Sequence, residues 1–373
     1  MKAFGVGCFH FALKDNMENA ITVQDYITEI KRILQKLTTA SEIKLHFDKS
    51  IRDGKINTSA PNPKINNGER YYPAIHFLNL SFNLYIPSRV QAELIKLSGS
   101  ILDTETENFK ITIRHEWHGP ISYVECLSAR DETQPSTAVQ VVREFLTTEL
   151  SKIGTFLTFD FLGPSPFHAD LYLLSESSQE DKQTKFLLEE IKSPAYNTLI
   201  FKYTDTDYSS EEEALEELFD TISDELSFYY ELKREARHNL KLWMEIQETT
   251  NSILLHEEQK KWRHLPKRLI EKPKLFKKAF KDIGLFKGHQ IFAKGDLDRN
   301  YASIYKNGKA EHYLKSYVDQ VIAEHTHYPL NETSELIKYF DQKSSKTVEL
   351  VTIVSAAILG GMAGSILTTA FGK

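Results

Sequence analysis

Two hydrophobic patterns alternate along the first 204 residues of the chain. Apolar residues at three- and four-residue spacing predict helices over residues 21–37 and 136–152. Alternating or short apolar runs predict strands, and the clearest places Ile111, Ile113 and His115 on one face. The expected strands cover residues 3–13, 43–47, 74–86, 109–116, 121–127, 155–162, 167–174 and 198–203. This pattern predicts an α+β head over residues 1–204, with a mostly antiparallel sheet and flanking helices.

A long helical pattern follows the head over residues 205–264. Ser209 and Ser210 each precede a glutamate by three residues, which is the signature of a helix start. Neither glycine nor proline occurs between Pro194 and Pro266, so one helix of roughly 80 Å is possible. Its apolar residues suit a coiled coil or packing on the head's sheet, and their aromatic members favour the sheet. These residues are Leu215, Phe219, Ile222, Leu226, Tyr229, Ala236, Leu240 and Trp243.

Residues 265–346 form a basic, mostly helical region in this interpretation. A short helix is expected over 273–283, with Pro273 at its start and Gly284 just past its end. Residues 291–305 are expected to be a loop or short hairpin, and further helices are expected over 311–325 and 332–340.

The last stretch of the chain predicts a membrane anchor within residues 347–373. Residues 350–371 carry no charge, and a helix of that length would span roughly 33 Å, close to the thickness of a bilayer core. Small residues four apart allow close helix approach in lipid, which predicts self-association and a homo-oligomer. These residues are Ala357, Gly360, Gly361, Gly364 and Ser365. The chain is therefore expected to be a tail-anchored, single-pass membrane protein with its bulk in the cytoplasm.

Charge is distributed unevenly although the net charge is only −6. Residues 205–225 contain ten acidic residues and no lysine or arginine, whereas residues 260–294 contain twelve basic residues and two acidic ones. The basic segment could neutralise the acidic one, contact anionic lipid or bind nucleic acid, with nucleic acid the least favoured partner. The lysines expected to make such contacts are Lys274, Lys277, Lys278 and Lys281.

Catalytic signals in the head are weak. His115, His118, His168 and Asp170 could form an acid–base or metal site, but the chain has no HExxH, CxxC or phosphate-binding glycine loop. Asp170 and the segment 190–192 also match the spacing of a PD-(D/E)xK nuclease. The two cysteines give neither a disulfide framework nor the spacing of a zinc site, and the sequence does not identify a cofactor.

The pattern favours a non-enzymatic protein. Its head would bind a ligand or partner and couple that event, through the long helix, to a self-associating membrane helix. Membrane perturbation by such an oligomer would suit an effector in antiviral defence. The alternative is a membrane-tethered, metal-dependent hydrolase or nuclease that uses the four residues of the candidate catalytic site.

Overall fold

The computed structural model shows two compact units. Unit 1 contains Met1–Arg234 and Asn300–Glu324, and unit 2 contains Glu235–Arg299 and His325–Lys373. The described residues are 1–14, 21–47, 54–56, 78–98, 106–129, 134–163, 167–176, 184–194, 196–258, 265–306, 311–324, 327–346 and 349.

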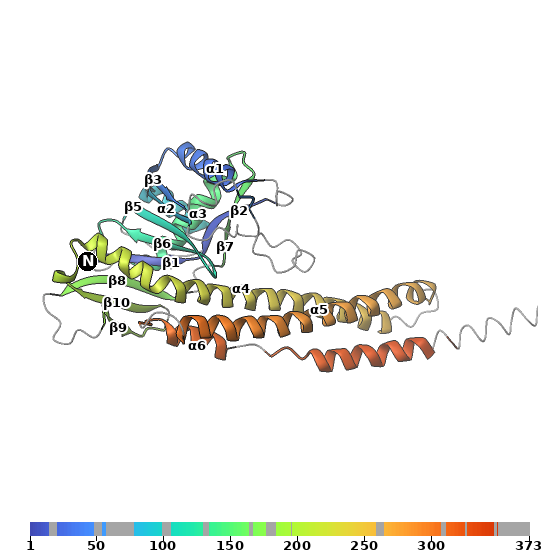
Figure 1. The fold of residues 1–373 in the computed structure, drawn as a ribbon. Helices are drawn as coiled ribbons and strands as arrows, with labels where there is room; N and C mark the ends of the chain where they lie inside the picture. The colour runs from blue at the N-terminus through green and yellow to red at the C-terminus, as the bar shows by residue number, and fades with distance from the viewer. Residues whose placement is uncertain are drawn as a thin grey trace, which may run out of the picture. The chain divides into compact units, whose positions relative to one another are not determined.

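Unit 1 is built on an eight-stranded mixed sheet (Figure 1). The strand order is β3-β4-β5-β6-β1-β8-β10-β9. Neighbouring strands are antiparallel except β8 and β10, which are parallel. The strands are β1 (Lys2–Gly7), β3 (Ala40–His46), β4 (Leu78–Tyr85), β5 (Asn108–Glu116), β6 (Gly119–Cys126), β8 (Ala169–Glu176), β9 (Leu187–Ile191) and β10 (Asn197–Thr204). The chain leaves β1 at Cys8 and enters β2 (Phe9–Leu13), which pairs with β7 (Leu157–Phe161) in a second, two-stranded sheet.

One face of the large sheet is covered by the helices α1 (Val23–Lys36), α2 (Ser88–Ser98) and α3 (Pro135–Ser151). The α3 helix lies so close to β1 that a Cβ atom at Gly5 would overlap the carbonyl oxygen of Pro135 and lie 2.5 Å from Val139. Glycine is therefore required at this crossing of helix and strand.

The opposite face of the sheet is covered by the first turns of α4 (Glu211–Glu258). The ring of Phe219 stacks on Tyr123 with centroids 3.9 Å apart, and it meets Phe4 edge-on. Tyr230 donates a hydrogen bond to the carbonyl oxygen of Val6 at 3.1 Å. The residues of the four–three pattern up to Tyr229 are all buried in unit 1. Of the two alternatives left open for this part of α4, packing on the sheet is the one observed.

A buried carboxylate fixes the last elements of unit 1. Glu225 of α4 accepts hydrogen bonds from the backbone N–H groups of Tyr313 and Leu314, at 2.9 and 3.0 Å. Leu314 is the N-cap of α6 (Lys315–Ala323), so Glu225 supplies the acceptor that the start of this helix needs. Burial raises the pKa of Glu225, although the two backbone N–H groups counteract part of that shift.

The described residues of unit 2 form three helical segments around one apolar core: the second part of α4, most of α5 (Leu265–Tyr305), and a helix over residues 330–346. Ile246 and Ile253 of α4 meet Phe276, Ile283 and Phe286 of α5 in this core. The expected end of the helix at Gly284 is therefore wrong, as is the loop expected over residues 291–305. A glycine inside a helix costs only about 1 kcal/mol, and burial of the apolar side chains on both sides of Gly284 outweighs that cost.

The predicted transmembrane helix requires correction. Among the residues that the structure describes, no helix is long and apolar enough to cross a membrane. The long helices α4 and α5, of 48 and 41 residues, carry charged side chains throughout. A single-pass, tail-anchored membrane protein is thus not supported, and the fold is an α+β body with a large mixed sheet and helices. The predicted span, with its proposed association residues Ala357, Gly360, Gly361, Gly364 and Ser365, lies outside the described residues.

Candidate functional site

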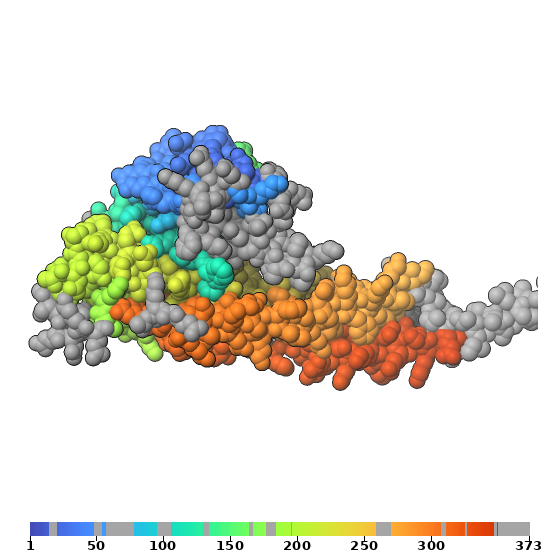
Figure 2. Space-filling model, viewed as in Figure 1, coloured from blue at the N-terminus to red at the C-terminus, as the bar shows by residue number. Residues whose placement is uncertain are grey.

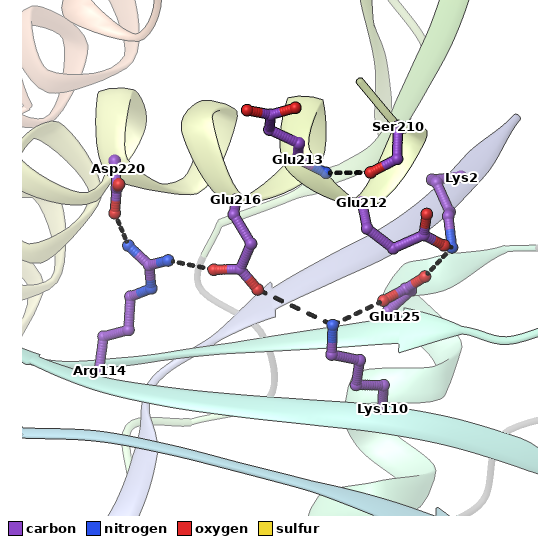
Figure 3. Close-up of polar contacts among 9 residues, drawn as sticks. All are labelled: Lys2, Lys110, Arg114, Glu125, Ser210, Glu212, Glu213, Glu216 and Asp220. Atoms are coloured by element: carbon purple, nitrogen blue, oxygen red, sulfur yellow. Dashed lines mark hydrogen bonds and ion pairs between the residues drawn. The ribbon is translucent and has the colours of Figure 1, made fainter. Parts of the chain in front are cut away.

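The acidic start of α4 is paired with basic side chains of the sheet in unit 1 (Figure 3). Arg114 of β5 forms ion pairs with Glu216, at 2.7 Å, and with Asp220. Lys110, four residues earlier on the same face of β5, lies 3.8 Å from Glu216 and 3.9 Å from the buried Glu125 of β6. Glu211, Glu212 and Glu213 lie in the first turn of α4, where the positive end of the helix dipole favours negative charge.

Lys2 extends this network on the neighbouring strand β1. Its amino group lies 2.8 Å from Glu125 and 3.0 Å from Glu212 (Figure 3). Burial alone would lower the pKa of Lys2. The hydrogen bonds and charges of these two carboxylates outweigh that effect, so the pKa of Lys2 is raised above its ordinary value. The hydroxyl of Ser210 accepts a hydrogen bond from the backbone N–H of Glu213, as expected at a helix start. The amino terminus pairs with Glu211, and Lys185 pairs with Glu217. The acidic segment thus has partners within unit 1.

The basic segment of α5, in contrast, presents its lysines to solvent in unit 2. Lys274, Lys277, Lys278 and Lys281 are all exposed, while Phe276, Ala279 and Ile283 between them point into the core. At 3.6 residues per turn the four lysines share an arc of about 100°. Ile270, Leu285 and Phe292 lie within the same arc and are exposed too, Ile270 by 62% and Phe292 by 74%. We call these seven residues the basic face of α5. Atoms of α5 form a long stretch of the visible surface in the space-filling view (Figure 2, orange).

One carboxylate lies beside the basic face. Burial raises the pKa of Asp282, and the charges of Lys278 and Lys281 partly oppose this rise. For Lys274 and Lys277 the structure shows no ion pair within the described residues. Most of the positive charge of this face is thus open to a partner.

The four candidate catalytic residues lie on different parts of unit 1. His115 is on β5, where its ring meets His10 edge-on with centroids 6.4 Å apart. His118 follows β5, and its Nδ1 lies 2.8 Å from a carboxylate oxygen of Glu231 on α4. His168 precedes β8 and stacks on Tyr196.

Asp170 of β8 accepts a hydrogen bond from the backbone N–H of Ser136, at 2.7 Å. Ser136 is in the first turn of α3, so Asp170 satisfies a backbone donor at the start of this helix. Burial raises its pKa, and the bond from Ser136 counteracts part of the rise. Two strands, β6 and β1, separate β8 from β5. No group of three or more histidine, cysteine, aspartate or glutamate side chains among the described residues is arranged to hold a metal.

The strand register also separates the carboxylates of the nuclease-like pattern. Residues 187–191 form the edge strand β9, and β10 lies between β9 and β8. In the strand register Asp170 pairs with Thr198, and Thr198 pairs with Ile191, so the side chains of these three residues point to the same face of the sheet. Because side chains alternate along a strand, Glu190 points to the face opposite Asp170. Glu190 instead accepts a hydrogen bond from the hydroxyl of Tyr317 at 2.9 Å.

A buried polar contact that the sequence did not indicate ties α4 to the bend between β1 and β2. The guanidinium of Arg234 donates to the thiol sulfur of Cys8 at 3.1 Å and to the carbonyl oxygen of His118 at 2.6 Å. Burial raises the pKa of the Cys8 thiol, and the nearby Arg234 offsets part of this rise. A buried, protonated thiol is a poor nucleophile, so this contact is structural. The partners are more than 100 residues apart in the chain, which is why no local pattern indicated it.

Comparison of the chain with protein-family models, curated proteins and solved structures finds no significant match. The interpretation as an effector of antiviral defence therefore has no support from a relative.

Proposed function

We propose that the protein binds the phosphate-bearing headgroups of anionic phospholipids through the basic face of α5. The observation that carries this proposal is the exposure of four lysines on one face of a folded helix. The acidic segment does not account for them, because in the described part of the chain its carboxylates pair with Lys2, Lys110, Arg114, Lys185 and the amino terminus. The proposal concerns contact with headgroups at a surface and depends on no spanning helix.

The apolar members of the basic face favour lipid over nucleic acid. A lysine near an anionic lipid surface contributes about 1 kcal/mol, so four lysines would contribute about 4 kcal/mol. Ile270, Leu285 and Phe292 share their arc and could enter the boundary between headgroups and acyl chains, where exposed apolar side chains gain free energy. Phosphates of a nucleic acid would accept the lysines equally well but offer no environment for Ile270 and Leu285.

Vesicle co-sedimentation of the full chain tests the proposal. Lys277→Gln with Lys281→Gln removes about 2 kcal/mol and should weaken binding to vesicles containing phosphatidylserine roughly 30-fold. Lys31→Gln with Lys36→Gln, at exposed positions of α1, is the control with the same change in charge and should bind as the unaltered chain does. Binding should fall as salt is added and be absent on neutral vesicles.

The opposite results are equally clear. Equal binding by both double variants would refute the role of the basic face. If the full chain bound duplex DNA but not anionic vesicles, and the double variant Lys277→Gln with Lys281→Gln lost the binding to DNA, the same lysines would be assigned to nucleic acid.

A further inference from the structure

The second part of α4, within unit 2, has an outward face that the core leaves uncovered. Ile246 and Ile253 point into the core and are buried. Eight other residues of this part are all exposed: Arg237, Leu240, Met244, Gln247, Glu248, Asn251, Leu255 and Glu258. At 3.6 residues per turn they fall within an arc of about 100°. We call these eight residues the outer face of α4.

Three large apolar side chains lie on the outer face of α4. Leu240 is 50% exposed, and Met244 and Leu255 are each 59% exposed. A single exposed leucine would need no explanation, but these three large apolar side chains, at spacings of four and eleven residues, lie in line along one helical arc. Polar residues Gln247, Glu248 and Asn251 interrupt the line, and charged residues end it.

The outer face of α4 is complementary to itself when reversed. When a second copy of this face is laid antiparallel on the first, centred between Gln247 and Glu248, Arg237 of one copy lies opposite Glu258 of the other. Leu240 then lies opposite Leu255. The same reversal places Met244 opposite Asn251. The charges therefore match in the antiparallel direction. In the parallel direction each end would meet its own copy, with arginine against arginine and glutamate against glutamate.

We propose that the outer face of α4 is an interface with a second copy of this chain, in which the two α4 helices pair antiparallel about a twofold axis. Such an isologous contact uses the same patch on both copies, so each matched pair of residues occurs twice. The two Leu240–Leu255 contacts cover two of the three exposed apolar side chains of each copy, and the two Arg237–Glu258 pairs fix the direction. This inference does not rest on lipid binding, although a dimer would carry two basic faces of α5 and could bind a surface through both.

Charge reversal tests the direction of pairing. In sedimentation velocity of the full chain, the unaltered protein should dimerise as its concentration rises. Arg237→Glu places carboxylates opposite each other at both ends and should weaken the dimer roughly tenfold, and Glu258→Arg should do the same through opposed cations. The double variant, Arg237→Glu with Glu258→Arg, restores both pairs and should recover the original affinity. Arg89→Glu, on the exposed side of α2, is the control with the same change in charge.

Cross-linking tests the register. The natural cysteines Cys8 and Cys126 are both buried, so an introduced cysteine can be read separately. Leu240→Cys with Leu255→Cys should form a disulfide-linked dimer on mild oxidation, whereas Leu240→Cys alone should not. A monomer at every concentration, no recovery in the double charge reversal, or cross-linking through Leu240→Cys alone would overturn the proposal.

Discussion

The polar network between the sheet and α4 makes a quantitative prediction for Lys2→Met. Glu125 is buried on β6, and the amino group of Lys2 lies 2.8 Å from its carboxylate. After the substitution the nearest cation would be Lys110, at 3.9 Å. The variant therefore leaves a buried carboxylate with a single, longer ion pair.

The expected cost is about 2 kcal/mol of unfolding free energy. Removal of one partner from a buried ion pair typically costs about 3–5 kcal/mol. The side chain of Lys2 keeps 17% of its surface exposed, so water screens part of the interaction and the lower value is appropriate. Because the pKa of Lys2 is raised above its ordinary 10.5, its contribution is complete below pH 10.5 and is lost only as the pH rises through the raised value. The cost should thus be the same at neutral and mildly alkaline pH.

A double-mutant cycle separates the ion pair from other effects of the substitution. Urea unfolding would be measured by circular dichroism for Lys2→Met, Glu125→Gln and the double variant, with hydrogen exchange in β1 and β6 assigning the transition to unit 1. We expect the loss of unfolding free energy in the double variant to be smaller, by at least about 1 kcal/mol, than the sum of the losses in the two single variants. Lys152→Met, whose partner Glu149 pairs with it at the surface, is the control and should leave stability unchanged. Additive costs within about 0.5 kcal/mol would refute the coupling of Lys2 to Glu125.

Three further measurements test the packing of unit 1. Because burial raises the pKa of Glu225 in the folded state, its ionisation opposes folding. The unfolding free energy should therefore fall as the pH rises from 4.5 through the raised pKa, and this fall should be absent from melting curves of Glu225→Gln. Gly5→Ala should lower the unfolding free energy by about 1–3 kcal/mol through its clash with α3, whereas Gly154→Ala, in open space, should not. Phe219→Ala removes the ring stacked on Tyr123 and should cost about 3–5 kcal/mol in urea unfolding.

Local patterns predicted most of the elements of unit 1 but not their arrangement. The helix α1 lies within the expected residues 21–37, and α3 lies within one residue of 136–152. The order of strands could not be predicted, because β1 pairs with β6 and β8, each more than 100 residues away. Such pairings depend on packing across the whole unit, which a hydrophobic period does not encode.

The start of α4 was predicted correctly, whereas both ends of α5 were predicted wrongly at internal helix breakers. The helix α4 begins at Glu211, where its capping signal lies, and continues to Glu258 without interruption. In α5, Pro273 and Gly284 resemble a start and a stop, yet the helix runs from Leu265 to Tyr305. The apolar residues on both sides of Gly284 share one core in unit 2, and this tertiary contact decides the length.

The charge blocks illustrate why the candidate site needed a structure. In the sequence, the acidic segment 205–225 and the basic segment 260–294 are near neighbours, and mutual neutralisation was the simplest interpretation. The structure gives the acidic segment other partners, including Lys110 and Arg114 of β5. These two residues lie on the face of β5 opposite Ile111 and Ile113, as the alternation predicts. Because the guanidinium of Arg114 is buried, it needs acidic partners on the element packed over this face. The acidic first turns of α4 are that element, which leaves the lysines of α5 available for a partner outside the chain.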